Sequence, residues 1–313
     1  MKLKRKFSPS IVESILSDLT PFDPTKFADS DNLRSWFDFF GLNRTPVALG
    51  TVLSGEFTLA VYSIIPPNAT NTVIFIPGFL DHAAVHKTLI NYLIDHNYAV
   101  IAVDLPGHGF SSGERGTISN FQHYGTMVSS LIDLAKQWNY PGKINLIGHS
   151  TGGAAILELI RTKGKCWSGE TILVAPLIRS PMWKLSTAGM AITKKIIRTS
   201  PRIFQTTSHD KKFLEFLRHE PHCIDTFVVE WSESLQEWVP LIESMEIQQF
   251  PITVIQGTDD FTVGWRQNMK TIRHLFPNAE ITMIYNGRHH LLNESPPYKN
   301  PVYDTIHSVL ERV

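Results

Sequence analysis

The chain has few cysteines, no excess of charge of either sign and no long hydrophobic run. Its two cysteines, Cys166 and Cys223, are too few for a disulfide scaffold and lack metal-ligand spacing. Lysine plus arginine and aspartate plus glutamate both number 29, so the net charge offers no general attraction for nucleic acid. No stretch approaches the ~18 apolar residues of a membrane-spanning helix, and the basic start MKLKRKFSPS lacks the apolar run of a secretory signal. We therefore expect a cytoplasmic protein that binds no nucleic acid.

Hydrophobic residues make up 42% of the 313 residues and charged residues 19%, which is enough apolar material for a large folded core. Residues 1–45 predict a helical N-terminal leader, with an amphipathic patch at 11–19 and an aromatic cluster at 36–40. The alternating segments 47–53 and 57–64 are separated by Ser54-Gly55 and predict a β-hairpin.

Beyond residue 70 the pattern changes to strands and helices in alternation. Short apolar runs rich in β-branched residues recur at 73–76, 99–103, 144–147, 172–174, 252–255 and 281–284. Stretches with helical periodicity separate most of these runs, at 86–96, 121–137, 154–163 and 265–276. Continuous apolar runs are typical of strands buried on both faces. The alternation predicts an α/β fold with a mostly parallel central sheet flanked by helices.

Residues 177–249 interrupt this rhythm because they contain apolar helical stretches and no comparable strand run. We interpret them as a mostly helical lid inserted into the sheet domain. The predicted core domain therefore consists of residues 46–176 and 250–313.

A serine in a glycine-rich turn is the first candidate for chemistry. Gly148-His149-Ser150-Thr151-Gly152 follows the predicted strand 144–147 directly and precedes an apolar helix. A nucleophile on a sharp strand-to-helix turn crowds its neighbours, so the positions two before and two after it must be nearly free of side chain. Gly148 and Gly152 meet that requirement. The alternative is a nucleotide-binding turn, which would be expected at the first strand-to-helix turn and not here. We predict Ser150 as a nucleophile on an α/β-hydrolase fold.

A serine hydroxyl needs a base that is oriented by a carboxylate. On this fold the carboxylate and then the histidine follow the serine in loops after later strands. The loop after 252–255 contains Asp259 and Asp260, and the loop after 281–284 contains His289 and His290. We favour Asp260 because apolar residues follow it and would bury its base. We favour His289 over His290, and the other member of each pair stays an alternative.

The developing oxyanion of the reaction needs hydrogen-bond donors. The loop after strand 73–76 reads Pro77-Gly78-Phe79, and the position of Phe79 in the fold makes its backbone N–H a candidate donor. The backbone N–H of Thr151, at the positive start of the helix after Ser150, is the second candidate.

Three segments resemble the lysophospholipase and monoacylglycerol-lipase branch of the α/β-hydrolases, a branch of the serine aminopeptidase S33 type. The segment 104–113, DLPGHGFSSG, resembles the D-x-x-G-H-G-x-S-x-G motif of this branch. Pro77-Gly78 occurs where the branch usually has His-Gly, and 289–294, HHLLNE, is similar to its H-E-x-L-N-E. The resemblance covers roughly residues 47–313 and implies His289 as the base. Phe79 is bulkier than the small residue common at its position, which would narrow the acyl or leaving-group pocket.

The resemblance implies a serine hydrolase that cleaves carboxylic esters of lipid-like substrates, without cofactor or metal, through an acyl-enzyme on Ser150. Two alternatives stay open: a carboxylesterase or thioesterase for soluble esters, and a non-catalytic ligand-binding protein on the same fold. The intact order of Ser150, Asp260 and His289 favours an enzyme.

The first part of the predicted lid is basic and apolar. Its cations are Arg179, Lys184, Lys194, Lys195, Arg198 and Arg202. An apolar helix edged by cations can contact an anionic membrane surface or receive a phosphate headgroup. The alternative is that this helix packs on the core domain and its charges are simply solvated.

Overall fold

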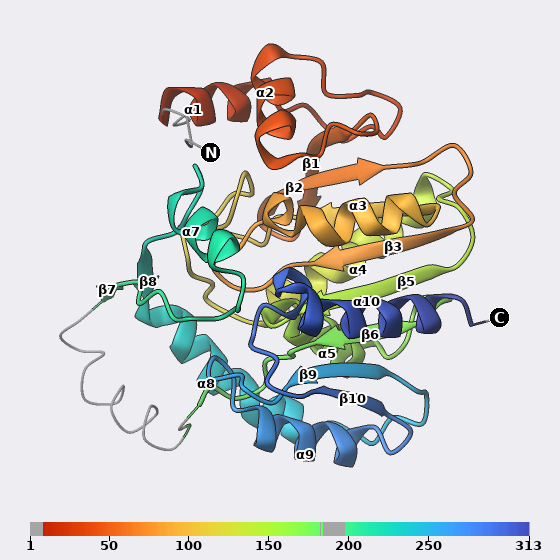
Figure 1. Cartoon of the computed structure of the whole chain (residues 1–313), viewed down its shortest axis with the longest axis vertical. Helices are drawn as coiled ribbons and strands as arrows, with labels where there is room; N and C mark the ends of the chain where they lie inside the picture. Colours follow the sequence, from red (N-terminus) through yellow and green to blue (C-terminus); the bar gives the residue numbers. More distant parts are fainter. Residues whose placement is uncertain (1–8, 182, 184–197, 313) are drawn as a thin grey trace.

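The computed structural model describes residues 9–181, 183 and 198–312. Its centre is an eight-stranded sheet with the order β1-β2-β4-β3-β5-β6-β9-β10 (Figure 1). The strands are β1 (Ala48–Ser54), β2 (Phe57–Ile64), β3 (Asn71–Ile76), β4 (Tyr98–Val103), β5 (Ile144–His149), β6 (Thr171–Val174), β9 (Thr253–Gly257) and β10 (Glu280–Ile284). The pairs β1–β2 and β2–β4 are antiparallel, and all other neighbours run parallel. The predicted α/β fold with a mostly parallel sheet is confirmed.

Side chains alternate between the two faces of this sheet, because successive residues of a strand point in opposite directions. In β3, Ile74 and Ile76 belong to one core and Val73 and Phe75 to the other. The first core is covered by α4 (Gln122–Gln137), α5 (Thr151–Lys163), α8 (Val229–Glu243) and α9 (Trp265–Leu275). The second is covered by α1 (Pro9–Asp18), α2 (Asp31–Phe40), α3 (Lys87–Asp95) and α10 (Pro296–Leu310). Figure 1 shows α3 and α10 on the near face.

The N-terminal residues are part of the second core. The Oγ atom of Ser30 caps α2 by accepting a hydrogen bond from the N–H of Leu33 at 3.2 Å. Helix α2 then buries Trp36 and Phe40 completely. The Phe40 ring lies 5.1 Å from the imidazole of His82, in the loop after β3. Helix α2 therefore packs against the loop predicted to carry the oxyanion donor.

The segment predicted as a lid contains helices and a short strand pair. Helix α7 (Lys211–His219) begins after Asp210, whose carboxylate accepts from the N–H groups of Lys212 and Phe213. The strands β7 (Thr199–Pro201) and β8 (Thr226–Val228) pair antiparallel. The sequence did not predict this pair, because three-residue strands without an apolar run leave no periodic signal.

The basic edge of the predicted lid is described only in part, since Lys184, Lys194 and Lys195 lie outside the described residues. Arg179 forms an ion pair with Glu243, and Arg198 pairs with Glu114 of the core at 3.4 Å. Within the described ranges, no helix combines the length and the hydrophobicity needed to span a bilayer. Peripheral membrane contact stays a prediction.

Candidate active site

Ser150 lies on a strained turn between β5 and α5. Its backbone φ of 53° and ψ of −113° are rare for a residue with a side chain. A Cβ on Gly148 would lie 2.5 Å from the carbonyl oxygen of Gly152, and a Cβ on Gly152 would lie 2.1 Å from that of Ile76. The two flanking glycines thus allow the sharp turn that presents Ser150 at the carboxyl end of the sheet.

Asp260 and His289 meet at the same end of the sheet, from the loops after β9 and β10. The Oδ2 atom of Asp260 lies 2.9 Å from Nδ1 of His289, and both side chains are buried. The other oxygen of Asp260 accepts from the N–H groups of Thr262 and Val263. Burial alone would raise the pKa of Asp260, but the charge and hydrogen bond of His289 and the Thr262 N–H hold it below its usual value. The carboxylate is therefore ionised and oriented toward the imidazole.

The structure distinguishes the two candidate aspartates from each other, and likewise the two candidate histidines. Asp259 is partly exposed and pairs with Arg288 at 3.4 Å. His290 turns away from Asp260, and its Nε2 lies 3.1 Å from Oδ2 of Asp81. Among the two aspartates and two histidines, Asp260 and His289 are the pair in contact.

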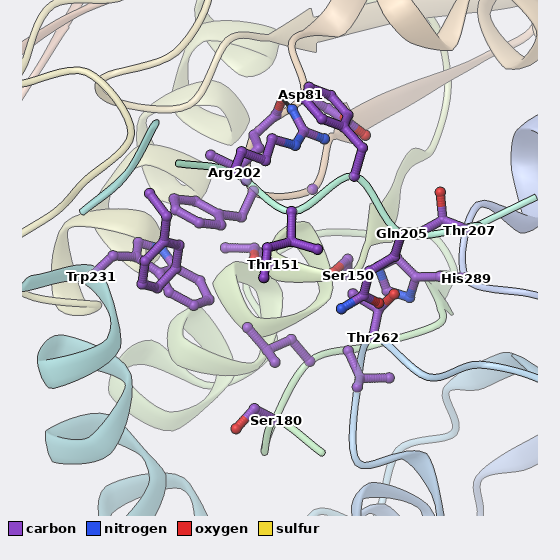
Figure 2. A pocket seen from close by; sticks show the side chains of 18 of the residues that line it. Asp81, Ser150, Thr151, Ser180, Arg202, Gln205, Thr207, Trp231, Thr262 and His289 are labelled. Carbon is purple, nitrogen blue, oxygen red and sulfur yellow. Dashed lines mark hydrogen bonds between the residues drawn. The ribbon is translucent and has the colours of Figure 1, made fainter. Parts of the chain in front are cut away.

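A cavity of about 510 Å³ brings the predicted residues together. Ser150, Thr151, Phe79 and His289 all line it, and Figure 2 shows Ser150 and His289 on its wall. In the described chain no hydrogen bond joins the Ser150 hydroxyl to His289. The catalytic roles of these residues stay predictions.

The loop after β3 approaches the turn at Ser150 closely. A Cβ on Gly78 would lie 3.0 Å from Nδ1 of His149 and 3.1 Å from Cβ of Ser150. Within the described chain, the backbone N–H groups of Phe79 and Thr151 donate to no other residue. Both residues line the cavity, and their role as oxyanion donors stays a prediction. The Phe79 ring, predicted to narrow the pocket, stacks on Trp231 of α8 at 3.9 Å.

The segment 104–113 supports this loop from behind. The Asp104 carboxylate accepts from the N–H of Ala83 at 2.8 Å and from the N–H of Phe110 at 2.9 Å. A Cβ on Gly109 would lie 2.1 Å from that carboxylate, which explains the glycine. Burial raises the pKa of Asp104. The motif that carries the family resemblance thus holds two loops together and does not line the cavity.

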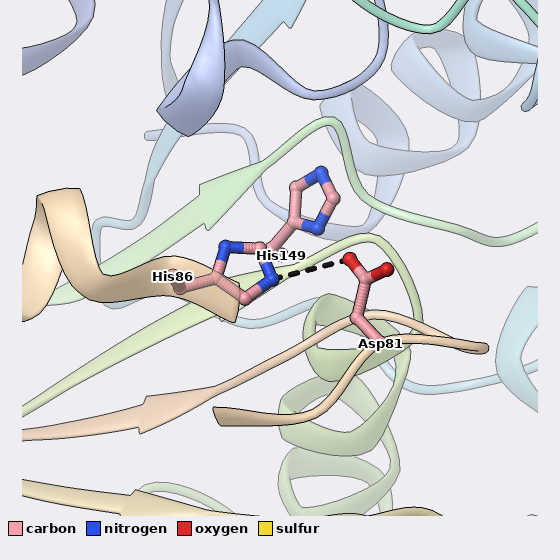
Figure 3. A group of neighbouring side chains, drawn as sticks. All are labelled: Asp81, His86 and His149. Carbon is pink, nitrogen blue, oxygen red and sulfur yellow. Dashed lines mark hydrogen bonds and ion pairs between the residues drawn. The ribbon is translucent and has the colours of Figure 1, made fainter. Parts of the chain in front are cut away.

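Sequence reasoning missed a buried cluster around Asp81. The Oδ2 atom of Asp81 lies 3.2 Å from Nε2 of His86, and it also bonds His290. Asp81, His86 and His149 offer ligand atoms within 4.8 Å of one another, a donor set that could hold a divalent metal (Figure 3). Burial would raise the pKa of Asp81, but His290 and His86 hold it well below its usual value. Hydrogen bonds thus already satisfy the Oδ2 atom. No spacing rule in the sequence connects residues 81, 86 and 149.

A second buried pair joins the predicted lid to the loop after β3. Nε2 of His82 lies 3.1 Å from Oε2 of Glu220, and both side chains are 2% exposed. The same oxygen of Glu220 accepts from the N–H of His222 at 2.7 Å. Burial alone would lower the pKa of His82, but Glu220 raises it above its usual value. Glu220, which lies in the predicted lid, therefore holds the loop that carries Phe79 in place.

His108 is a buried imidazole whose protonation opposes folding. Its Nδ1 lies 2.8 Å from the carbonyl oxygen of Pro106, which identifies Nδ1–H as the donor. Burial lowers the pKa of His108 from 6.5 to about 4. Because the unfolded chain binds the proton more readily, this group costs stability as the pH falls from about 6.5 toward 4, and the loss levels off below that.

We expect the variant His108→Asn to be less sensitive to acid than the wild type, since asparagine keeps an N–H donor and does not titrate. The difference in the free energy of unfolding between pH 7 and pH 5 should be smaller by about 2 kcal/mol in the variant. Urea unfolding at both pH values measures it. An equal pH dependence in the two proteins would show that His108 titrates normally in the folded state.

A serine at a strained strand-to-helix turn, a buried Asp–His pair and a parallel sheet of this order define an α/β-hydrolase. The chain belongs to the serine aminopeptidase S33 family of hydrolases, because the model of that family matches residues 67–296. It is an ester-hydrolysing serine hydrolase of the lipase and esterase type, and its similarity to a phospholipase and to monoglyceride lipases supports this class.

Several of the similar proteins are lipases. The chain is 26% identical to monoglyceride lipase from Homo sapiens over 254 residues, which cover 77% of this chain and 82% of that protein. It is 21% identical to phospholipase YtpA from Bacillus subtilis over 232 residues, covering 72% and 89%. Among solved structures, a monoacylglycerol lipase from Paleococcus ferrophilus superposes with a TM-score of 0.69 at 18% identity, covering 80% and 98%. The TM-score is 0.70 for a soluble variant of monoglyceride lipase from Saccharomyces cerevisiae, at 18% identity and covering 84% and 94%.

Proposed function

We propose that the chain hydrolyses carboxylic esters with a lipid-like acyl chain, in the manner of a lysophospholipase or monoacylglycerol lipase. The observation that carries the proposal is the contact of Asp260 with His289 at 2.9 Å beside Ser150, in a cavity with a largely apolar lining. Its apolar residues include Leu177, Leu214, Leu217, Phe227, Trp231, Leu235 and Val263. Such a lining favours an acyl chain over a small polar acid. The names of the similar lipases point the same way.

The proposed mechanism uses three side chains, Ser150, His289 and Asp260. His289 accepts the proton of the Ser150 hydroxyl at Nε2 while Oγ attacks the ester carbonyl carbon. The Phe79 and Thr151 N–H groups bind the oxygen that becomes negative, and Asp260 stabilises the imidazolium. When the C–O bond of the ester breaks, His289 gives its proton to the leaving alcohol. Water then attacks the acyl-enzyme by the same route, and the acid is released with Ser150 restored.

The domain boundaries belong to the same proposal. Residues 177–249 act as a lid over a core of residues 46–176 and 250–313, and residues 1–45 are a leader. The position of Trp231 and Phe227 on the cavity supports a lid that supplies part of the acyl site.

A series of p-nitrophenyl esters tests the acyl preference. Burial of each methylene contributes about 0.8 kcal/mol, so kcat/KM should rise by about two- to fourfold per methylene from acetyl to octanoyl. A fluorophosphonate probe should label the wild type and not Ser150→Ala. Highest activity on acetyl or butyryl esters would favour a carboxylesterase for soluble esters, and absence of labelling would favour a ligand-binding protein.

A further inference from the structure

Two walls of different chemistry line the cavity. Helix α8 and neighbouring loops supply an apolar wall, which includes Trp231, Leu235 and Val263. The stretch between residues 200 and 218 supplies a mixed wall, in which two arginines, Arg202 and Arg218, accompany apolar residues such as Leu214 and Leu217. Figure 2 shows Ser150 between Trp231 on one side and Gln205 and Thr207 on the other, with Arg202 beyond Thr151. An ester bound at Ser150 can therefore place its acyl and alcohol parts against different walls.

Arg202 is held in place by the protein and still has donors left. Its Nη1 donates to the carbonyl oxygens of Leu80 at 3.2 Å and Ile224 at 3.1 Å. Its guanidinium lies 4.8 Å from the centre of the Phe204 ring. Because a guanidinium has five N–H donors, the two carbonyls leave donors available for a ligand.

Arg218 approaches the same aromatic ring from the last turn of α7. Its guanidinium lies 5.9 Å from the centre of Phe204, so one ring contacts both cations. Both arginines thus contact one side chain that itself lines the cavity. Three side chains form this arrangement: Arg202, Phe204 and Arg218.

Among the described residues, no carboxylate forms an ion pair with the two arginines of this wall, Arg202 and Arg218. Asp81, an acidic residue on the cavity wall, is 3% exposed; its Oδ2 bonds His86 and His290, and its Oδ1 is buried. A ligand in the cavity therefore meets two cations and no available carboxylate among the described lining residues.

We propose that Arg202 and Arg218 form an anion subsite that binds a phosphate on the alcohol part of the ester. The substrate class is then an acylated alcohol phosphate, with the acyl chain on the apolar wall and the phosphate on the arginines. Guanidinium groups bind phosphate oxygens through charge-assisted hydrogen bonds. The inference rests on the proposed ester hydrolysis at Ser150, since it assigns the leaving-group side of that site.

Short-chain esters below their micelle concentration test the subsite without a lipid surface. The substrates are 1-hexanoylglycerol 3-phosphate and 1-hexanoylglycerol, which differ only in the phosphate, and hexanoylglycerophosphocholine separates a phosphate monoester from a zwitterionic headgroup. The variant is Arg218→Gln, because Arg202 also holds Leu80. Arg273→Gln is the matched control, since Arg273 is exposed on α9 and does not line the cavity.

The wild type should hydrolyse the phosphate ester with a kcat/KM about tenfold above that of the neutral ester. In Arg218→Gln this ratio should fall by about five- to tenfold, mainly through KM, while Arg273→Gln should keep the wild-type ratio. Added salt should reduce the preference in the wild type. Equal kcat/KM on the two esters in the wild type, or an equal ratio in wild type and Arg218→Gln, would overturn the proposal.

Binding to an inactive protein separates failure of the subsite from failure of the proposed function. Ser150→Ala should bind 1-hexanoylglycerol 3-phosphate more tightly than Ser150→Ala/Arg218→Gln by about five- to tenfold, as read by the fluorescence of Trp231 in the cavity wall. If no ester is hydrolysed but this difference is found, the hydrolytic function fails and the anion subsite stands. Equal affinities would overturn the subsite whatever the activity.

Discussion

Replacement of Ser150 by alanine is expected to lower kcat by about 10⁴- to 10⁶-fold on any ester that the chain hydrolyses, because it removes the proposed nucleophile and with it the proposed acyl-enzyme. The remaining activity would come from the Phe79 and Thr151 N–H groups and from substrate binding. Alanine keeps the Cβ of Ser150 and leaves Gly148 and Gly152 in place, so the turn should form as before. Steady-state kinetics with p-nitrophenyl octanoate measures the loss.

Ser232→Ala is the matched control for this change. Ser232 lines the same cavity from α8, and its replacement removes one hydroxyl without touching the turn at Ser150. We expect kcat to change by less than about fivefold in this control. Thermal unfolding of both variants checks that the fold persists. A similar loss in both variants, or a loss below tenfold in Ser150→Ala, would contradict Ser150 as the nucleophile.

Replacement of Asp260 by asparagine is expected to lower kcat by about 10⁴-fold. The carboxylate contacts Nδ1 of His289 and, in the proposed mechanism, stabilises the imidazolium, whereas an amide carries no charge and, with its oxygen on Thr262 and Val263, turns its NH2 group toward Nδ1. Asparagine still offers an oxygen to the N–H groups of Thr262 and Val263, so the loop should keep its shape. Kinetics on the same ester gives the loss, and circular dichroism verifies folding.

Asp259→Asn tests the alternative that the sequence left open. Asp259 pairs with Arg288 at 3.4 Å and is partly exposed, so its loss should change kcat by less than about threefold. The contrast between the two variants distinguishes adjacent residues of identical type. A large loss in Asp259→Asn with a small one in Asp260→Asn would assign the acid to position 259.

Loss of Asp260 should also remove a source of acid sensitivity. Its pKa is held below the usual value in the folded chain, so the ionised form stabilises the fold above the pKa of the unfolded chain. This contribution disappears as the pH falls through the lower pKa of the folded state. Stability measurements on Asp260→Asn must therefore be compared at neutral pH.

The order of elements could be predicted because it depends on local patterns. Six apolar runs became the strands β3, β4, β5, β6, β9 and β10, since an apolar run flanked by helical segments has few other ways to bury itself. Ser150 could be singled out because a turn this tight requires glycines two residues before and after it, and Gly148 and Gly152 are visible in the sequence. Strand pairing then brings the loops after β5, β9 and β10 to one edge.

The choice within each adjacent pair was decided only by the tertiary structure. Asp259 and Asp260 have the same chemistry, and only the path of the chain after β9 directs one to His289 and the other to Arg288. The contacts of Asp81 with His86 and His290, and of His82 with Glu220, also join residues that no local period relates. Local sequence determined where the sharp turn at Ser150 lies, because steric crowding acts between neighbours along the chain. Its surroundings were decided by packing between distant segments, since burial and charge act through space.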